Sequence, residues 1–115
     1  MTAAAHRIVA LVPDLMDRSR VTAALGEGVE LVATARHLRD RLESGPEPDL
    51  VLIDLGRRGI LDALPGIREA THARIIGFGA HVERDLLAAA RAAGCDQVLA
   101  RSAFFAQLPD LTAST

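Results

Sequence analysis

The alternation of short apolar runs with segments of helical spacing constrains the fold of this chain more than any other feature. Five apolar runs recur at similar intervals, at residues 7–12, 29–33, 49–55, 73–78 and 96–100. They are rich in Val, Ile and Leu and do not alternate strictly with polar residues, which is typical of strands covered on both faces of a parallel sheet. Periodicity alone would also allow buried helix, but the short lengths and neighbouring glycines favour strands.

Segments with helical spacing separate the runs and follow the last one. We predict helices at residues 14–26, 34–45, 60–70, 81–94 and 102–111. The segment 81–94 has the clearest pattern, because its apolar residues form one stripe that ends at a glycine. The stripe comprises Val82, Leu86, Ala89, Ala90 and Ala93. We expect Pro65 and Gly66 to interrupt 60–70, and Ser102 to cap the last helix.

A strand followed by a helix, repeated five times, implies a parallel sheet with right-handed crossovers and helices on both faces. The 115 residues suit one domain, residues 1–115, with one core. In a doubly wound sheet, functional groups gather beyond the carboxyl ends of the strands. The residues expected at those ends are Pro13, Asp14, Asp54, Gly56, Gly79, His81, Arg101 and Ser102. We therefore predict one pocket at this edge of the sheet.

Composition narrows the classes of function. The net charge of −2 provides no basic field for nucleic acid, and aromatic residues, at 3%, provide no platform for base stacking. No apolar run approaches the roughly 20 residues of a membrane span, and the first residues lack the apolar core of a signal peptide, so we expect a cytoplasmic protein. Cys95 is expected to be buried and structural. All 13 basic residues are arginine, which excludes any mechanism that needs a lysine.

Two stretches carry a resemblance to a known family. They are "EPDLVLIDL" at the third strand, and "AAARAAGCDQVLARSAF" from the fourth predicted helix into the fifth. This layout resembles the receiver domain of bacterial two-component response regulators, and the similarity covers almost the whole chain. The resemblance implies a flavodoxin-like (βα)5 fold, in which five parallel strands have the order 2-1-3-4-5, with two helices on one face and three on the other.

The resemblance also implies a phosphorylation site. In receivers, an aspartate at the end of the third strand accepts a phosphoryl group. A Mg²⁺ ion, held by that aspartate and an acidic pair after the first strand, offsets the charge. The acceptor maps to Asp54 and the acidic pair to Pro13 and Asp14, so one carboxylate is missing. No metal or cofactor is expected unless Asp14 and Asp54 bind Mg²⁺ by themselves.

The remaining working positions of a receiver are also replaced in this sequence. The phosphate-binding hydroxyl maps to Gly79, the rotating aromatic to Val98 and the lysine to Arg101. Losing both the hydroxyl and the aromatic argues that the chain does not transmit phosphorylation by that route. An arginine that forms a two-point ion pair with Asp54 would satisfy the buried acid without metal or phosphate. The candidate charge partners of Asp54 are Arg57, Arg58 and Arg101.

Asp17 lies one helical turn beyond Asp14 and has two interpretations. Its carboxylate could face the pocket, or both acids could cap and charge the start of the first helix, where carboxylates are favourable. We favour the second interpretation for Asp17, because acids are common at helix starts.

We therefore interpret the chain as an atypical or pseudo-receiver, a non-enzymatic signalling module that works by protein binding. The sequence begins with Met1 and holds no output domain, so we expect it to act through a protein partner or as a homodimer. By resemblance, the partner face is residues 81–111. The adjacent Phe104 and Phe105 are predicted to pack in the core, although one of them is a candidate for exposure at that face.

Two alternatives stay open. The first is a phosphorylatable single-domain response regulator that accepts a phosphoryl group on Asp54 with Mg²⁺. The second, more remote, is a small flavodoxin-like enzyme or ligand carrier. No nucleophile, metal cluster or cofactor loop favours it, and Ser102 near His81 is better explained as a helix cap than as a nucleophile.

Overall fold

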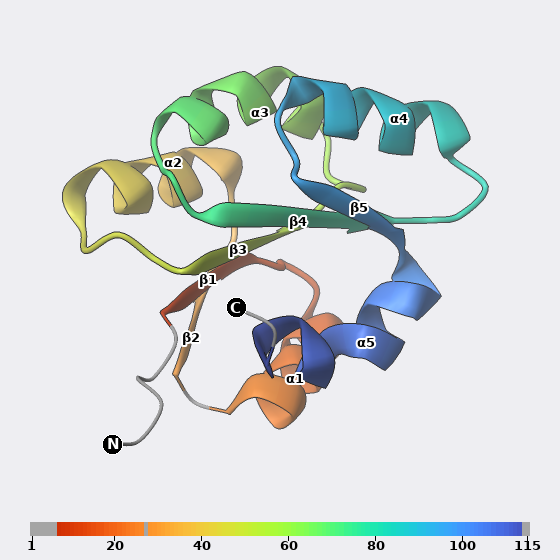
Figure 1. The fold of residues 1–115 in the computed structure, drawn as a ribbon, viewed down its shortest axis with the longest axis horizontal. Coiled ribbons are helices and arrows are strands. Elements are labelled where there is room, and N and C mark those ends of the chain that lie inside the picture. The colour runs from red at the N-terminus through yellow and green to blue at the C-terminus, as the bar shows by residue number, and fades with distance from the viewer. Residues whose placement is uncertain (1–6, 27, 114–115) are drawn as a thin grey trace.

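The computed structural model describes residues 7–26 and 28–113, with side chains up to Leu111, so the N-terminal residues that bear on the absence of a signal peptide lie outside it. Five strands form one parallel sheet in the order β2-β1-β3-β4-β5 (Figure 1), which confirms the predicted topology. The strands are β1 (Ile8–Leu11), β2 (Val29–Val32), β3 (Leu50–Asp54), β4 (Arg74–Gly79) and β5 (Gln97–Ala100). The helices are α1 (Leu15–Leu25), α2 (Ala35–Ser44), α3 (Ile60–Glu69), α4 (Arg84–Ala93) and α5 (Arg101–Ala113).

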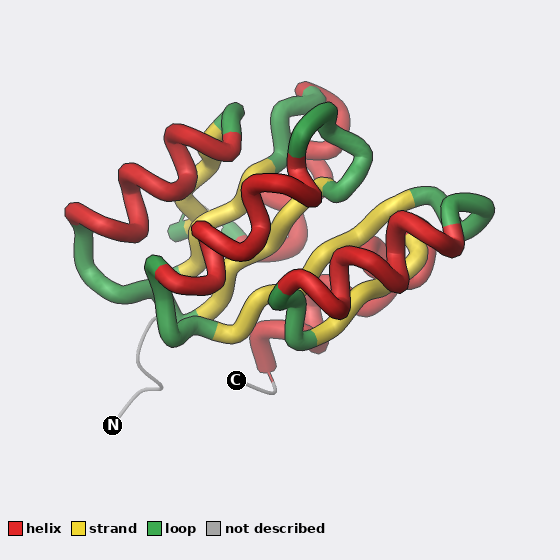
Figure 2. The backbone as a smooth tube through the Cα atoms, turned by 90° about the horizontal axis from the view of Figure 1, so that it is seen from above, coloured by secondary structure: helices red, strands yellow, loops and turns green. Residues whose placement is uncertain are grey.

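Helices cover both faces of the sheet, as predicted. Figure 1 shows α1 and α5 packed together on one face and α2, α3 and α4 on the other. Figure 2 views the three-helix layer from above, with the helices side by side across the strands. Each face has its own apolar core. Leu38 and Leu64 are buried under the three-helix layer, and Phe104 and Leu108 are buried under the two-helix layer.

The middle strand, β3, places the candidate site. All five of its residues are buried, which explains its continuous apolar run, because helices cover both of its faces. Asp54 is its last residue and lies opposite Phe78 of β4. Parallel strands end at the same edge of a sheet, so Asp54 lies at the edge where α1, α5 and the loop after β4 begin.

Helix α3 continues through Pro65 and Gly66, so the predicted interruption is wrong. Its buried residues Ile60, Leu64 and Ile67 recur at helical spacing, and their packing outweighs the weak local propensity of the two residues between them. Pro65 is exposed, so the ring meets solvent rather than a neighbouring element.

The starts of α4 and α5 also differ from the prediction. Helix α4 begins at Arg84, so Val82 lies in the loop before it and is 72% exposed instead of belonging to the apolar stripe. Ala89 is exposed as well, whereas Leu87 packs against the core. Helix α5 begins at Arg101, so Ser102 lies in the first turn and is not the residue that caps it.

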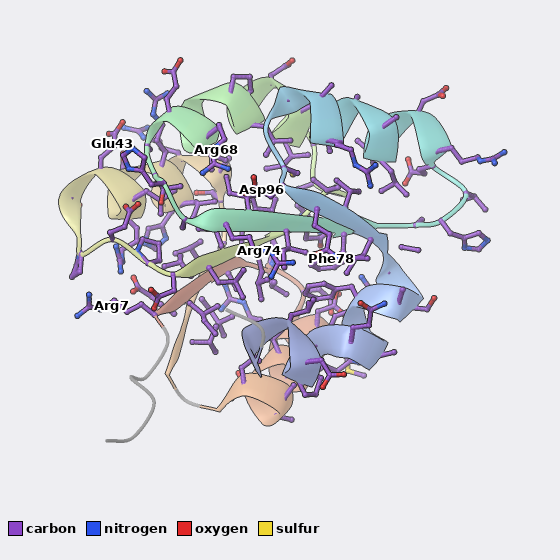
Figure 3. All side chains as sticks on the ribbon, in the orientation of Figure 1. Arg7, Glu43, Arg68, Arg74, Phe78 and Asp96 are labelled. Atoms are coloured by element: carbon purple, nitrogen blue, oxygen red, sulfur yellow. The ribbon has the colours of Figure 1, made fainter. Side chains whose placement is uncertain are left out.

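An arginine ties the amino ends of β4 and β5 to α3, at the opposite edge from the candidate site (Figure 3). Nη2 of Arg68 donates to the carbonyl oxygens of Thr71 (2.9 Å) and Ala73 (2.7 Å). Nη1 donates to Oδ2 of Asp96 (2.9 Å), which also accepts from the backbone N–H of Ile75 (2.8 Å). These contacts give hydrogen-bond partners to backbone groups at the junctions between α3, β4 and β5.

Candidate functional site

Asp54 is a buried carboxylate at the carboxyl end of β3. The residue is 7% exposed, and its Oδ1 accepts a hydrogen bond from the backbone N–H of Gly56 at 2.9 Å. Burial raises the pKa of Asp54 above its usual value, because water no longer stabilises the charged form. The Gly56 hydrogen bond and the positive charges of Arg57 and Arg101 oppose this rise.

Arg101 contacts Asp17 rather than Asp54, which corrects the expected pairing. It is the first residue of α5, and its Nη2 donates to Oδ1 of Asp17 in the first turn of α1. Helices α1 and α5 lie side by side on the same face of the sheet, so the two side chains meet. In the described part of the chain, no arginine lies within ion-pair distance of Asp54.

The two loop arginines also make no direct contact with Asp54. Arg57 and Arg58 are both exposed in the turn between β3 and α3. Arg57 acts on Asp54 only as a nearby positive charge that lowers the pKa of that carboxyl. The expectation that "GRRG" supplies an ion pair is therefore not met, although the loop does contribute to the electrostatics of the site.

The two acids at the start of α1 have different roles. Asp14 is exposed and caps the helix, because its Oδ1 accepts from the backbone N–H of Asp17 at 3.0 Å, and this confirms its interpretation as a capping residue. The side chain of Asp17 is only 3% exposed and forms an ion pair with Arg101. The interpretation of Asp17 as an acid that merely charges the start of the helix is therefore incomplete. Pro13 is half-buried and contributes no carboxylate.

Leu87 of α4 packs against Gly79, the residue to which the resemblance assigns the phosphate-binding hydroxyl. A Cβ atom built on Gly79 would lie 3.1 Å from Cδ2 of Leu87. Two residues earlier on β4, a Cβ atom built on Gly77 would lie 2.9 Å from Cδ1 of Leu55, the residue after Asp54. The two glycines of β4 therefore let leucine side chains pack closely on the strand, and a larger residue at either position would require the leucine to shift.

Val98, the residue at the position of the rotating aromatic, lies on β5 beside Gly77 of β4 and packs against the same core as Leu87. It is half-buried and lines a shallow hollow of about 330 Å³ together with Leu87, Ala88 and Arg91. A β-branched side chain has few rotamers and no ring to swing between two positions. The hollow lies within residues 81–111, the region that the family resemblance led us to expect as the partner face.

The residues present do not fit a magnesium site. Mg²⁺ requires near-octahedral oxygen ligands, usually carboxylates with water and phosphate. Asp14 is turned to the backbone of α1, Asp17 is bound to Arg101, and Pro13 has no ligand to offer. Among the residues that the structure describes, no group of three His, Cys, Asp or Glu side chains could hold a metal ion.

Other sequence candidates lie outside this arrangement. His81 and Ser102 are both exposed. Cys95 is buried, as predicted, and burial raises the pKa of its thiol to about 11, with the charge of Asp96 as a second cause. At neutral pH the thiol therefore stays protonated and unreactive. Over the described ranges, no helix is both long and apolar enough to cross a membrane.

Comparison with known proteins places this geometry in a structural class. No protein-family model matches the chain, and no curated protein matches its sequence. Among solved structures, a response regulator from Hahella chejuensis has a TM-score of 0.81 at 16% identity, over 94% of this chain and 92% of that one. The phosphorylated cyanobacterial phytochrome response regulator RcpA has a TM-score of 0.76 at 16% identity, over 96% and 91%. The pilus assembly protein CpaE from Caulobacter crescentus has 0.70 at 13% identity, over 96% and 92%.

These similarities show that the chain has the fold of response-regulator receiver domains. The strand order and the helix layers match that fold, so the architecture expected from the resemblance is confirmed. At such identities the likeness extends to the fold and not to the roles of individual residues. What the chain does must therefore be argued from its own site.

Proposed function

We propose that this chain is a pseudo-receiver, a signalling module that works by binding a protein and is not switched by conventional phosphorylation of Asp54. The observation that carries the proposal is that the groups near Asp54 are committed to other contacts. Arg101 is bonded to the buried Asp17, and Leu87 packs where Gly79 lacks a side chain.

A conformational switch needs a group that interacts differently with its two states. In the receiver domains that the chain resembles, a hydroxyl and an aromatic ring provide that difference. Here Gly79 has no hydroxyl with which to bond a phosphate, and Val98 has no ring to rotate. A phosphoryl group on Asp54 would therefore meet no device that transmits its presence to the surface of α4 and β5.

Treatment with a small phosphodonor tests the proposal. We expect no gain of one phosphate by intact mass after incubation with acetyl phosphate and Mg²⁺. Beryllium fluoride, which mimics the bound phosphoryl group, should leave the amide resonances of residues 81–111 unchanged. A hydrolysable mass gain that is absent in Asp54→Asn would refute the proposal in favour of the phosphorylatable alternative. Asp40→Asn, at an exposed position on α2, serves as the matched control.

The phosphorylatable alternative is favoured by the position of Asp54 and by its burial. Asp54 is retained at the carboxyl end of the central strand. In the receiver domains that the chain resembles, the residue at this position accepts the phosphoryl group. The raised pKa of Asp54, caused first by burial, makes it a better proton acceptor than an exposed aspartate. Phosphorylation with resonance changes confined to the surroundings of Asp54 would mean that the acceptor works but the switch does not.

For the partner surface we propose the region 81–111. Its apolar contribution comes from the exposed Val82 and from the hollow that Leu87 and Val98 line, beside the exposed Arg91. The adjacent phenylalanines do not contribute, because Phe104 is fully buried and Phe105 packs half-buried against the same core. The partner is either another protein or a second copy of the chain.

Sedimentation velocity over a range of concentrations tests the homodimer. If residues 81–111 form the interface, Val82→Ser with Arg91→Glu should lower the association constant, since the first removes apolar area and the second reverses a charge. Met16→Ser on α1 is the matched control, because Met16 is 76% exposed and lies outside the region. Equal weakening by both variants would place the interface elsewhere.

A further inference from the structure

We propose that the guanidinium of Arg101 is the built-in cation of the acidic edge formed by Asp14, Asp17 and Asp54, so that the folded chain needs no divalent metal there. The contact that carries this inference is the hydrogen-bonded ion pair between Nη2 of Arg101 and Oδ1 of Asp17. It joins residues 84 positions apart in the sequence and links the first turns of α1 and α5.

Burial of Asp17 makes a neighbouring positive charge necessary. Its side chain is 3% exposed, and a carboxylate withdrawn from water costs several kcal/mol unless it is paired and hydrogen-bonded. Arg101 is 44% exposed, so the cation keeps part of its hydration while its Nη2 reaches the buried oxygen. The arrangement neutralises the acid at a smaller desolvation cost than a fully buried pair.

The same guanidinium also acts on Asp54. Its positive charge favours the ionised form of that carboxyl, whereas the negative charge of Asp17 disfavours it. One cation therefore offsets two acids, one by direct contact and the other at longer range. This is the electrostatic task that a divalent metal would perform between carboxylates.

Two aromatic rings hold Arg101 in place. Its guanidinium carbon lies 5.2 Å from the ring centre of Phe105 and 5.9 Å from that of Phe78, within the range of cation–π attraction. A positive charge at the first residue of a helix is opposed by the helix dipole, and the negative charge of Asp17 relieves that repulsion. The pair therefore stabilises the start of α5 as well as the buried acid.

The carboxylates near Arg101 already have hydrogen-bond partners. Oδ1 of Asp14 accepts the capping hydrogen bond and Oδ1 of Asp17 accepts from Arg101, so an ion that took either of these oxygens would compete with an existing contact. The guanidinium belongs to the chain itself, so the compensation does not depend on the supply of a metal.

A mutant cycle with and without Mg²⁺ tests the inference. Wild type, Arg101→Gln, Asp17→Asn and the double variant are melted in excess Mg²⁺ and in EDTA, and amide spectra are recorded in both. We expect the wild-type melting temperature and the resonances of Asp14, Asp17 and Asp54 to be the same in both buffers. Arg101→Gln should melt several degrees lower in EDTA, regain part of that loss in Mg²⁺, and be rescued by adding Asp17→Asn. The double variant should not respond to Mg²⁺.

Three results would overturn the inference. They are stabilisation of the wild type by Mg²⁺, simple addition of the two single losses in the double variant, and an Arg101→Gln variant no more sensitive to Mg²⁺ than the wild type. If Arg101→Gln does not fold, Arg101→Lys takes its place and should stay insensitive to Mg²⁺, because it keeps the charge. Arg58→Gln, at an exposed loop arginine, is the control. No phosphodonor enters this experiment, so its result is independent of whether Asp54 accepts phosphate.

Discussion

At the scale of single residues, Asp54 destabilises the fold when it is charged. Because burial raises its pKa in the folded state, the unfolded chain loses this proton at lower pH than the folded chain, and the contribution of Asp54 to folding is most favourable at low pH. Asp54→Asn, which can keep the hydrogen bond from Gly56, should therefore raise the free energy of unfolding at pH 7. The gain should shrink as the pH falls through the raised pKa and vanish below the ordinary value of 3.8. Urea unfolding followed by circular dichroism at several pH values measures it; a gain independent of pH would point to packing instead.

Gly79 gives a second prediction at this scale. Restoring a hydroxyl by Gly79→Thr drives its Cβ against Cδ2 of Leu87, and overpacking of this kind typically costs about 1–3 kcal/mol. In a Leu87→Ala background most of that cost should disappear, because the obstructing methyl groups are gone. Chemical denaturation of the four chains completes the cycle. An equal cost in both backgrounds would show that the strand backbone, and not Leu87, excludes the side chain.

At the scale of elements, Arg68 is the staple that joins α3 to the amino ends of β4 and β5. Arg68→Ala removes three hydrogen bonds to backbone carbonyls, those of Thr71, Ala73 and Gly94, and the ion pair with Asp96, so we expect a loss of about 2–4 kcal/mol in the free energy of unfolding. Arg91→Ala is a matched control, since it also lies in the last turn of its helix. It should cost less than about 1 kcal/mol, the usual size of a helix-dipole contribution. Similar losses for both variants would contradict the staple.

The elements show what the sequence could and could not predict. The strands followed from apolar runs because helices cover both faces of the sheet, and their alternation with helices indicated a parallel sheet. The strand order was an expectation from the family resemblance. The continuation of α3 through Pro65 could not be predicted from local sequence, because it depends on the packing of Ile60, Leu64 and Ile67 in the core. The start of α4 was misjudged because Val82 fits the apolar spacing but lies in the preceding loop.

The site was predictable in position but not in its contacts. Topology alone brings Asp14, Asp54 and Arg101 to one edge, because parallel strands end together. Which acid Arg101 contacts depends on the closeness of α1 and α5, and that distance is not encoded in any local pattern. A useful signal existed nonetheless, because Asp17 and Arg101 lie in the first turns of α1 and α5, the two helices that share one face of the sheet.

At the scale of the whole molecule, two separate apolar layers share one sheet. Residues of the same strand alternate between the layers; on β3, Val51 belongs to the three-helix core and Leu52 to the two-helix core. The Cα radius of gyration of 13.0 Å agrees with the roughly 13 Å expected for a compact chain of about 100 residues. The two layers share the same strands, so loss of packing in one layer exposes one face of the sheet on which the other layer also depends.

This coupling predicts one cooperative unfolding transition. Leu64→Ala in α3 and Leu108→Ala in α5 are a matched pair, because each removes a fully buried leucine from a different layer. Each should lower the free energy of unfolding by about 2–5 kcal/mol, the usual range for such a cavity. Urea titration followed by amide resonances from both layers should give coincident midpoints in each variant, as two-state unfolding requires. If Leu108→Ala released α1 and α5 at lower urea than α3, the layers would be independent, and a partner at residues 81–111 could be bound by one layer alone.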